Sequence, residues 1–266
     1  MGTNHFRRAW LTVIPLLVVA MLWLAGCDDD VSGPTEVAEQ PFAFDLDAVD
    51  QLRLILENIN GTITVSGALG TDSAFIDGVR QVWSESREDA EAHLSDVQVE
   101  VDVVADSIIV RTTQPTRADN RIYAVNYELV IPARLEVWIV NANGVISVEF
   151  IDNTVSIVNA NGDITLDEIV GSVAVVLANG DVDSQVTLPL DGVIDHVVAN
   201  GSIQLSIPTN TSAVFSAEVG NGTISTSNLV FENETSTDST FTGRLGEGRG
   251  EIALVLGNGN ITVLGF

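Results

Sequence analysis

The sequence contains no lysine and a single cysteine, and each scarcity excludes a class of function. Nine arginines and 37 acidic residues follow Cys27, so the chain from that point on has a formal charge of −28. A surface of this sign repels nucleic acid, so we expect no nucleic-acid partner. Because Cys27 is the only thiol, the rest of the chain can form no disulfide framework or cysteine nucleophile. Stability must therefore come from burial and backbone pairing.

Histidine is almost as scarce, with His5, His93 and His196 the only three in the chain. No Ser–His–Asp arrangement, metal-binding helix or phosphate loop can be assembled around them. We expect His93 on a polar helix and His196 at the surface before a turn. The sequence therefore predicts a protein that is not an enzyme, with no catalytic residue and no cofactor. A carbohydrate-active enzyme is the remaining alternative, because some β-solenoids cleave polysaccharides with pairs of acids.

The first 26 residues have the composition of an export signal. Arg7 and Arg8 precede a long uncharged apolar run that ends in small residues before Cys27. The sequence Leu-Ala-Gly-Cys at 24–27 resembles the bacterial lipobox, in which the cysteine is alkylated with diacylglycerol and becomes the new N-terminus. We predict a signal peptide over 1–26 and a lipid anchor at Cys27. An uncleaved membrane helix is the alternative for the apolar run.

The segment after the predicted anchor is rich in Asp, Glu, Pro, Ser and Gly. Such a composition favours a flexible acidic tether over 27–48, which would hold a folded domain away from the membrane. We therefore expect an exported protein that is lipid-anchored to the bacterial cell envelope. The sequence leaves open whether the inner or the outer membrane holds it.

One short phrase, Asn-Gly between runs of strand-forming residues, returns along the chain. The intervals between its later glycines are 18, 18, 21, 21 and 37 residues. A spacing near 20 indicates a stacked array, in which one circuit of three short strands forms each coil. The last interval would hold an additional coil, as a protruding loop or irregular rung. The predicted turn ladder consists of Asn143, Gly144, Asn161, Gly162, Asn179, Gly180, Asn200, Gly201, Asn221, Gly222, Asn258 and Gly259.

Aligning the repeats on glycine shows an inward-facing column. Two positions after each glycine stands a β-branched aliphatic residue, and the early Gly61 obeys the same rule with Ile63. Four positions after the glycine the residue is mostly apolar again, while those between are generally polar, as in a strand with one buried face. The aligned residues are Ile63, Ile146, Ile164, Val182, Ile203, Ile224 and Ile261.

We predict an all-β fold, a parallel β-solenoid of 18–21-residue coils over 49–266. Asn-Gly also favours a hairpin, so an antiparallel β-meander or sandwich is the alternative. The solenoid is favoured because stacked coils place equivalent residues about 4.8 Å apart, where identical side chains can bond to one another. Residues 135–266 would form the regular coils. Residues 67–134 would be less regular and contain one short helix near 84–96, capped by Ser84 or Ser86.

The recurrent Asn-Gly-(Asp/Ser/Thr)-Ile units, together with the strand at 127–132 that ends in Pro132, resemble a bacterial adhesin family. That family is described as a domain of unknown function with β-strand repeats on exported or membrane-anchored proteins. The resemblance covers most of 49–266 and implies a solenoid with an adhesive or envelope role. Its partners would be the membrane, through the lipid anchor, and a glycan or envelope protein. The oligomeric state stays open.

Calcium binding is a second alternative. Asp163 and Asp181 follow successive Asn-Gly pairs, so the solenoid would stack their carboxylates in adjacent coils. Two like charges at that spacing favour a bound cation. The later units replace the acid by Ser202, Thr223 and Asn260, so most of this column is neutral. We therefore assign no metal ligand and keep the two aspartates as weak candidates.

Overall fold

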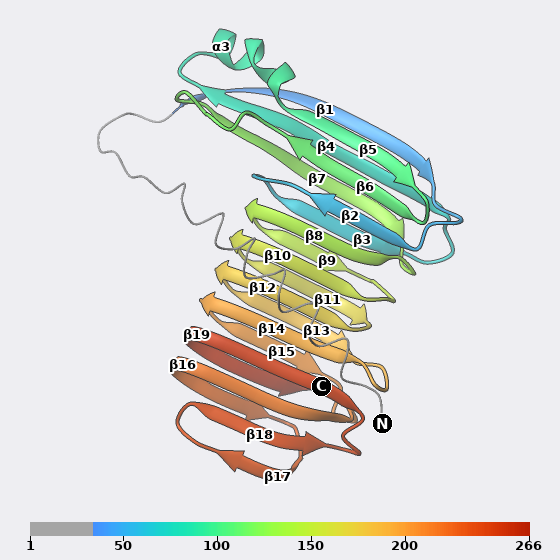
Figure 1. The fold of residues 1–266 in the computed structure, drawn as a ribbon, viewed down its shortest axis with the longest axis vertical. Helices are drawn as coiled ribbons and strands as arrows, with labels where there is room; N and C mark the ends of the chain where they lie inside the picture. Colours follow the sequence, from blue (N-terminus) through green and yellow to red (C-terminus); the bar gives the residue numbers. More distant parts are fainter. Residues whose placement is uncertain (1–33) are drawn as a thin grey trace. The chain divides into compact units, whose positions relative to one another are not determined.

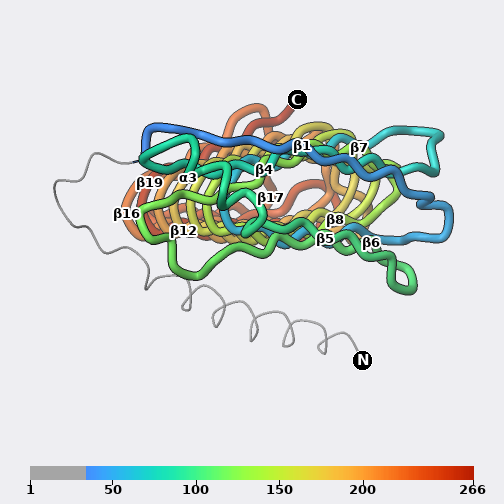
Figure 2. Tube along the Cα trace, turned by 90° about the horizontal axis from the view of Figure 1, so that it is seen from above, coloured from blue at the N-terminus to red at the C-terminus, as the bar shows by residue number. Residues whose placement is uncertain are grey.

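The computed structural model describes residues 34–266, which form one compact unit with its own core. The predicted signal peptide, Cys27 and the first part of the predicted tether lie outside the described residues. About two thirds of the described chain is strand, and its coils trace a flattened loop when seen along the stack (Figure 2). Among residues 34–266 no helix is long and apolar enough to cross a membrane.

Two layers of strands stack along one axis (Figure 1). Layer 1 contains, in spatial order, β5 (Gln98–Val104), β6 (Ser107–Thr113), β2 (Arg53–Glu57), β8 (Glu136–Asn143), β10 (Val155–Asn161), β12 (Val173–Asn179), β14 (Val193–Asn200), the first half of β19 (Gly250–Gly265), the first half of β16 (Ala213–Ser227), β18 (Thr240–Leu245) and β17 (Phe231–Ser236).

Layer 2 lies opposite, and the chain crosses between the layers at each Asn-Gly corner. It contains, again in spatial order, β1 (Glu36–Asp47), β4 (Ser73–Ser84), β7 (Ile122–Pro132), β3 (Ile63–Ala68), β9 (Ile146–Glu149), β11 (Ile164–Val170), β13 (Val182–Thr187), β15 (Ile203–Ile207) and the second halves of β19 and β16.

Pairing between successive coils is parallel and in register, which confirms the predicted parallel β-solenoid. Each circuit has two strands rather than the three expected, because one strand on each side of the corner accounts for most of an 18–21-residue coil. Antiparallel pairs occur at the two ends of the stack, between β1, β4 and β7, between β5 and β6, and in the β16–β18–β17 end.

The core is the predicted aliphatic column. Six of the seven glycine-aligned residues are at most 1% exposed, and Ile224, in the last coil of layer 2, is half-buried. Each buried Ile or Val contributes roughly 1.5–3 kcal/mol, so neighbouring coils stabilise one another without covalent links. Four positions after the glycines, two residues are polar: Ser184 is fully buried and Thr226, in the last coil of layer 2, is half-buried.

The spatial order of the coils differs from their order in the chain at two places. The β2–β3 coil lies between β6–β7 and β8–β9, and β19 lies between the β14–β15 coil and β16. The expectation of an additional coil within the 37-residue interval is wrong. That interval contains the antiparallel hairpin β17–β18, after which the chain returns to fill the place beside β14 and β15.

The predicted tether is wrong for residues 36–47, which form β1 and pair with β4 along its whole length. Alternate apolar side chains explain this pairing, because Phe42, Phe44 and Leu46 pack against the core while Ala43 and Asp45 between them face solvent. The Phe42 ring lies 5.6 Å from that of Tyr127. Pro41 is tolerated since β1 is an edge strand.

The predicted helix is present but shorter than expected, with α3 at Arg87–Ala92 and a 3-10 turn η1 at Leu94–Asp96. Ser86 is the N-cap, and its hydroxyl oxygen accepts a hydrogen bond from the Asp89 amide at 3.2 Å. The helix packs against β1 and β4 at the N-terminal end of the stack. Residues 67–134 thus contain β6 and β7, which pair in parallel with β2 and β3, and the antiparallel strands β4 and β5 that cap them.

Candidate functional site

The asparagines of the predicted turn ladder lie directly above one another at one corner of the solenoid. The amide nitrogen of each donates to the side-chain oxygen of the asparagine in the adjacent coil, at 2.7–3.0 Å. The series runs Asn60, Asn143, Asn161, Asn179, Asn200, Asn258, Asn221, so it follows spatial order rather than chain order. The accompanying glycines, Gly61, Gly144, Gly162, Gly180, Gly201, Gly259 and Gly222, all have φ between 115° and 149°.

The weak metal candidates Asp163 and Asp181 lie one coil apart, and each carboxylate bonds to the next coil. Asp163 Oδ1 accepts from the Asp181 amide at 2.9 Å, and Asp181 Oδ1 accepts from the Ser202 amide at 2.7 Å. The Ser202 hydroxyl donates to the same Asp181 oxygen. Within residues 34–266 no three His, Cys, Asp or Glu side chains converge on a point. The two acids therefore act as links between coils.

A second asparagine column, inside the corner, was not predicted from the sequence. Asn58, Asn141 and Asn159 precede the ladder asparagines by two positions and are at most 4% exposed. Asn159 Nδ2 lies 3.0–3.2 Å from three turn carbonyls, those of Gly144, Asn161 and Gly162. Neither side-chain atom of Asn141 has a partner among the described residues. The sequence signal was the replacement of this asparagine in later coils by Leu177, Val198, Val219 and Leu256, which marks a buried position.

Asn159 has hydrogen-bond partners and Asn141 has none, which predicts opposite effects on stability for the same substitution at the two positions. Asn141→Leu should raise the free energy of unfolding by about 1 kcal/mol, because it removes two buried polar atoms without partners and copies Leu177. Asn159→Leu should lower it by about 2 kcal/mol, since three carbonyls lose a donor. Urea denaturation of residues 34–266 measures both. A loss of stability in Asn141→Leu equal to that in Asn159→Leu would contradict the assignment.

The structure corrects the surface placement of His196, which is fully buried and lies 3.0 Å from the Ser184 hydroxyl. Burial lowers the pKa of its imidazole to about 4, so the ring is neutral near pH 7. A substrate could not reach this pair. His93, as expected, lies on the helical cap.

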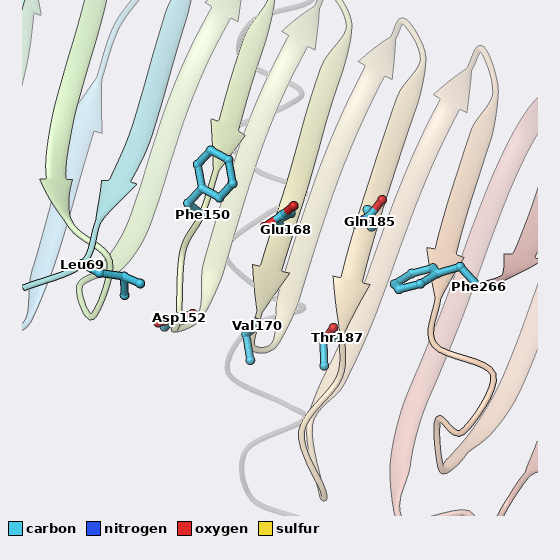
Figure 3. Close-up of a pocket in the computed structure, with 8 residues that line it drawn as sticks. All are labelled: Leu69, Phe150, Asp152, Glu168, Val170, Gln185, Thr187 and Phe266. Atoms are coloured by element: carbon cyan, nitrogen blue, oxygen red, sulfur yellow. The ribbon is translucent and has the colours of Figure 1, made fainter.

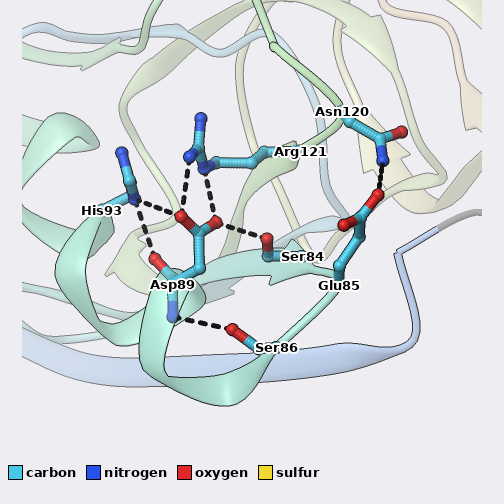
Figure 4. A network of polar contacts seen from close by, with 7 residues as sticks. All are labelled: Ser84, Glu85, Ser86, Asp89, His93, Asn120 and Arg121. Carbon is cyan, nitrogen blue, oxygen red and sulfur yellow. Dashed lines mark hydrogen bonds and ion pairs between the residues drawn. The ribbon is translucent and has the colours of Figure 1, made fainter.

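His93 belongs to a network that fixes the cap (Figure 4). Arg121 donates two hydrogen bonds of 2.7 Å to the Asp89 carboxylate, which also accepts from the Ser84 hydroxyl. The hydrogen bonds from Arg121 have the largest effect on the pKa of the Asp89 carboxyl, and together with the bond from Ser84 they hold it far below its usual range. His93 Nδ1 donates to the Asp89 backbone carbonyl at 2.8 Å. Because Ser84 bonds to the carboxylate and not to His93, the group lacks the geometry of a nucleophile and its base.

A groove of about 260 Å³ lies on layer 2, away from the Asn-Gly corner. Figure 3 shows its lining in two rows that run across successive coils. One row contains Phe150, Glu168, Gln185 and Phe266, and the other, closer to the turns, contains Leu69, Asp152, Val170 and Thr187. Leu69 is 82% exposed, Phe266 56% and Phe150 44%, so large apolar surfaces face solvent together.

Two residues of the groove have a strained backbone. Phe150 has φ 58° and Glu168 has φ 50°, a left-handed conformation that is an outlier for a bulky side chain. They occupy matching places in adjacent coils, and the pairing of β11 with β13 shifts between Leu166 and Ile169. The corresponding place in the next coil is Gly67, where a Cβ atom would lie 1.9 Å from the Phe150 carbonyl oxygen. The bulge turns these side chains toward the groove.

The groove offers aromatic faces, two carboxylates, an amide and a hydroxyl, and its lining includes neither arginine nor histidine. Aromatic faces bind apolar or sugar surfaces, while the polar groups at the same depth can accept or donate hydrogen bonds. General acid–base catalysis on an anionic sugar needs a positive group, which this lining does not supply. The arrangement is suited to binding.

Comparison with known proteins finds one matching family model for the repeat. Residues 139–264 match the model described as Toastrack DUF4097, which confirms the resemblance seen in the sequence over this part of the chain. A solved structure of a putative cell adhesion protein from Clostridium sporogenes is 11% identical, with 87% of this chain and 100% of that chain covered and a TM-score of 0.46. A putative adhesin from Bacteroides fragilis is 12% identical, with 85% and 97% covered and a TM-score of 0.33. The comparison with curated proteins found no match.

Proposed function

We propose that the chain is a non-catalytic, lipid-anchored protein of the bacterial cell envelope. In this proposal Cys27 holds the chain to the membrane, and the solenoid binds a glycan or an envelope protein through the groove on layer 2. The lipobox-like sequence before Cys27 and the resemblance to an adhesin family support the anchor and the adhesive role. The strongly acidic composition keeps the solenoid away from anionic surfaces and from other copies of itself.

The strained backbone at Phe150 and Glu168 is the main observation in support of a binding role for the groove. A left-handed conformation at Phe150 and Glu168 costs of order 1–3 kcal/mol for each residue, and stacking does not require it because β9 and β11 already pair in register before it. Backbone strain that turns an exposed aromatic ring into a groove is typical of a ligand-binding site. The strain therefore supports a role for the groove that is separate from folding.

Calcium binding is supported less well than partner binding. One oxygen of Asp163 and one of Asp181 already accept hydrogen bonds from the next coil, and a calcium ion would need six to eight oxygen ligands. The two aspartates are also exposed at a corner whose other members are neutral. A calcium-dependent interaction is thus an outcome of the binding experiment below.

Binding can be tested with residues 34–266 on an array of bacterial surface glycans and purified envelope proteins, with and without a chelator. The test variants are Phe150→Asn, since asparagine tolerates the left-handed backbone, and Phe266→Ser. Val214→Ser, an equally exposed apolar residue on β16, is the control. We expect any partner to lose at least about tenfold in affinity with both groove variants and none with the control. Binding that ignores the groove variants, or disappears on chelation, would contradict the proposal.

The anchor is tested in the full chain, produced in a lipoprotein-exporting bacterium with radiolabelled palmitate. We expect label in the membrane-bound wild-type protein and neither label nor membrane association in Cys27→Ala. A Cys27→Ala protein that stays in the membrane fraction with residues 1–26 attached would show an uncleaved helix instead.

A further inference from the structure

The two layers end differently at the C-terminal end of the stack. Layer 1 continues beyond β16 with β18 and β17, but β18 pairs only with residues 213–218. Residues 219–227 of β16 pair with β19 on one side. On the other side, apart from one bond from the Val219 amide to the Ser239 carbonyl, no strand of residues 34–266 pairs with them. Layer 2 therefore ends in an open edge (Figure 1).

The open edge has hydrogen-bonding groups ready for another strand. In an internal coil the Gly180 amide donates to the next coil at 3.0 Å, and the Val182 amide does so at 2.9 Å. The register of β16 gives the same role to Gly222 and Ile224, so their N–H groups point away from β19. Asn221 donates to Asn258, but its own side-chain oxygen accepts nothing from the described residues. At the opposite end, by contrast, Asn60 donates to the Tyr123 carbonyl and closes the ladder.

The inward-facing side chains at this edge are also less buried than those of the neighbouring strand. Ile224 and Thr226 are half-buried, whereas Ile261 and Val263, their register partners in β19, are fully buried. Both pairs face inward, so they differ in burial because β16 is the last strand of layer 2 and β19 has a strand on each side. One further strand would bury the Ile224 side chain as completely as that of Ile261.

The other three strand edges of the solenoid carry the usual protection against such pairing. β1 contains Pro41 among several acidic residues, and β5 carries Glu100 and Asp102. β17 carries Glu232 and Glu234 and is bulged at Asn233, which has φ 54°. Residues 219–227 contain no charged residue and no proline. In a chain with this excess of acidic residues, an edge that has neither charge nor proline lacks the features that prevent pairing with another strand.

We propose that residues 219–227 are a strand-addition site that takes an extended segment of a partner protein as the next strand of layer 2. The chemistry of the edge defines the segment: an aliphatic residue beside Ile224, a small amide or hydroxyl side chain beside Asn221, and no acidic residue. Basic flanks would complement Glu218, which leads into the edge, and the acids of β17. Main-chain bonds give affinity in this mode and the alternate side chains give specificity.

A second copy of the chain fits this edge poorly. Antiparallel pairing of two β16 edges would place the β17–β18 hairpins of both copies on the same side, where each extends layer 1 by two strands. Those four strands need about 19 Å, yet the paired edges would lie only about 4.8 Å apart. The opposite end of the stack is covered by β1, β4 and α3, so it offers no parallel coil either.

The test uses residues 34–266 and a synthetic peptide with the sequence of residues 255–264 and an added arginine at each end. Residues 255–264 are the natural parallel neighbour of β16, and they contain no acid. Fluorescence anisotropy measures affinity, and hydrogen exchange measures protection of the Gly222 and Ile224 amides. Thr226→Glu places a charge on the inner face, where it is tolerated only while the edge is open. Ser225→Glu, the same change on the outer face, is the matched control.

We expect the peptide to bind, to slow exchange at Gly222 and Ile224, and to lose at least about tenfold in affinity with Thr226→Glu but not with Ser225→Glu. A scrambled peptide should not bind. If Thr226→Glu unfolds the protein, the proposal is tested by hydrogen exchange at the Gly222 and Ile224 amides of the wild-type protein with and without the peptide. Absence of protection at the edge, equal affinity of both variants, or a wild-type dimer in sedimentation velocity that Thr226→Glu dissociates would each overturn the proposal.

Discussion

Replacing Gly201 by alanine is expected to lower the free energy of unfolding by about 4 kcal/mol, enough to unfold a marginal solenoid. Gly201 has φ 139°, a backbone conformation that side chains rarely adopt. A Cβ atom there would lie 1.9 Å from the Gly180 carbonyl oxygen in the adjacent coil. Because that atom belongs to the backbone of the corner between β12 and β13, which cannot move aside as a flexible side chain would, the clash separates the two coils. Urea denaturation followed by circular dichroism measures the loss.

Gly70→Ala is the matched control for this substitution. Gly70 also has a positive φ, 70°, but nothing lies within 4 Å of the position that a Cβ would occupy. Only the conformational strain remains, so the expected loss is about 1 kcal/mol. Equal losses for Gly70→Ala and Gly201→Ala would show that close approach of the coils does not matter at the corner.

Acidification from pH 6.5 to 4 is expected to remove on the order of 3 kcal/mol of stability through His196 alone. Its pKa is about 4 in the folded protein, against 6.5 for an unperturbed imidazole, because the ring is buried without solvent. Between these values the unfolded chain binds more protons, so stability rises with pH. The contribution is complete above pH 6.5 and is lost as the pH falls toward 4. Denaturant midpoints across this window measure it.

His196→Leu separates this effect from that of the many carboxylates. The register partner of His196 in β19 is Leu254, so leucine suits the position, and Ser184 keeps its contact with the Gln204 carbonyl. The variant should show a shallower loss of stability between pH 6.5 and 4 than the wild-type protein. Identical pH profiles for both proteins would mean that the pKa of His196 is the same in the folded and the unfolded protein, which would contradict this prediction.

The sequence was sufficient to predict the parallel coils, because their cause is local and repeated. Asn161 and Gly162 recur at one offset, and the residue two positions later is aliphatic every time. A periodic corner with a periodic core residue leaves few other ways to bury the apolar face. The Asn–Asn hydrogen bonds follow from that stacking.

The order of the coils could not be predicted, since it depends on which similar strands meet. The segments around Asn221 and Asn258 are almost interchangeable, and chain order alone would place the first beside Asn200. The structure places Asn258 there instead. β1 was missed for another reason: its acids resemble a tether, and only the cap β4 reveals which side chains face inward.

The candidate groove lies beyond sequence patterns, whereas the burial of His196 was missed although the pattern contained it. Nothing in the sequence marks Phe150 or Glu168 as left-handed, because neither is a residue type that favours this conformation. Phe150 and Phe266 are brought together only by the return of β19 into the stack. His196 occupies an inward position of its strand, so alternation from Ile194 would have indicated its burial.

Engineered disulfides in residues 34–266, which lack cysteine, test the stacking of coils most directly. Gln204 faces Thr262 in the adjacent strand, and Thr262 faces Ser225 one strand further. Adjacent positions lie about 4.8 Å apart, within reach of a disulfide, whereas two steps give about 10 Å, beyond it. We predict that the Gln204→Cys, Thr262→Cys pair oxidises fully and that the Gln204→Cys, Ser225→Cys pair does not. A bond in the second pair and none in the first would contradict the order of coils described above.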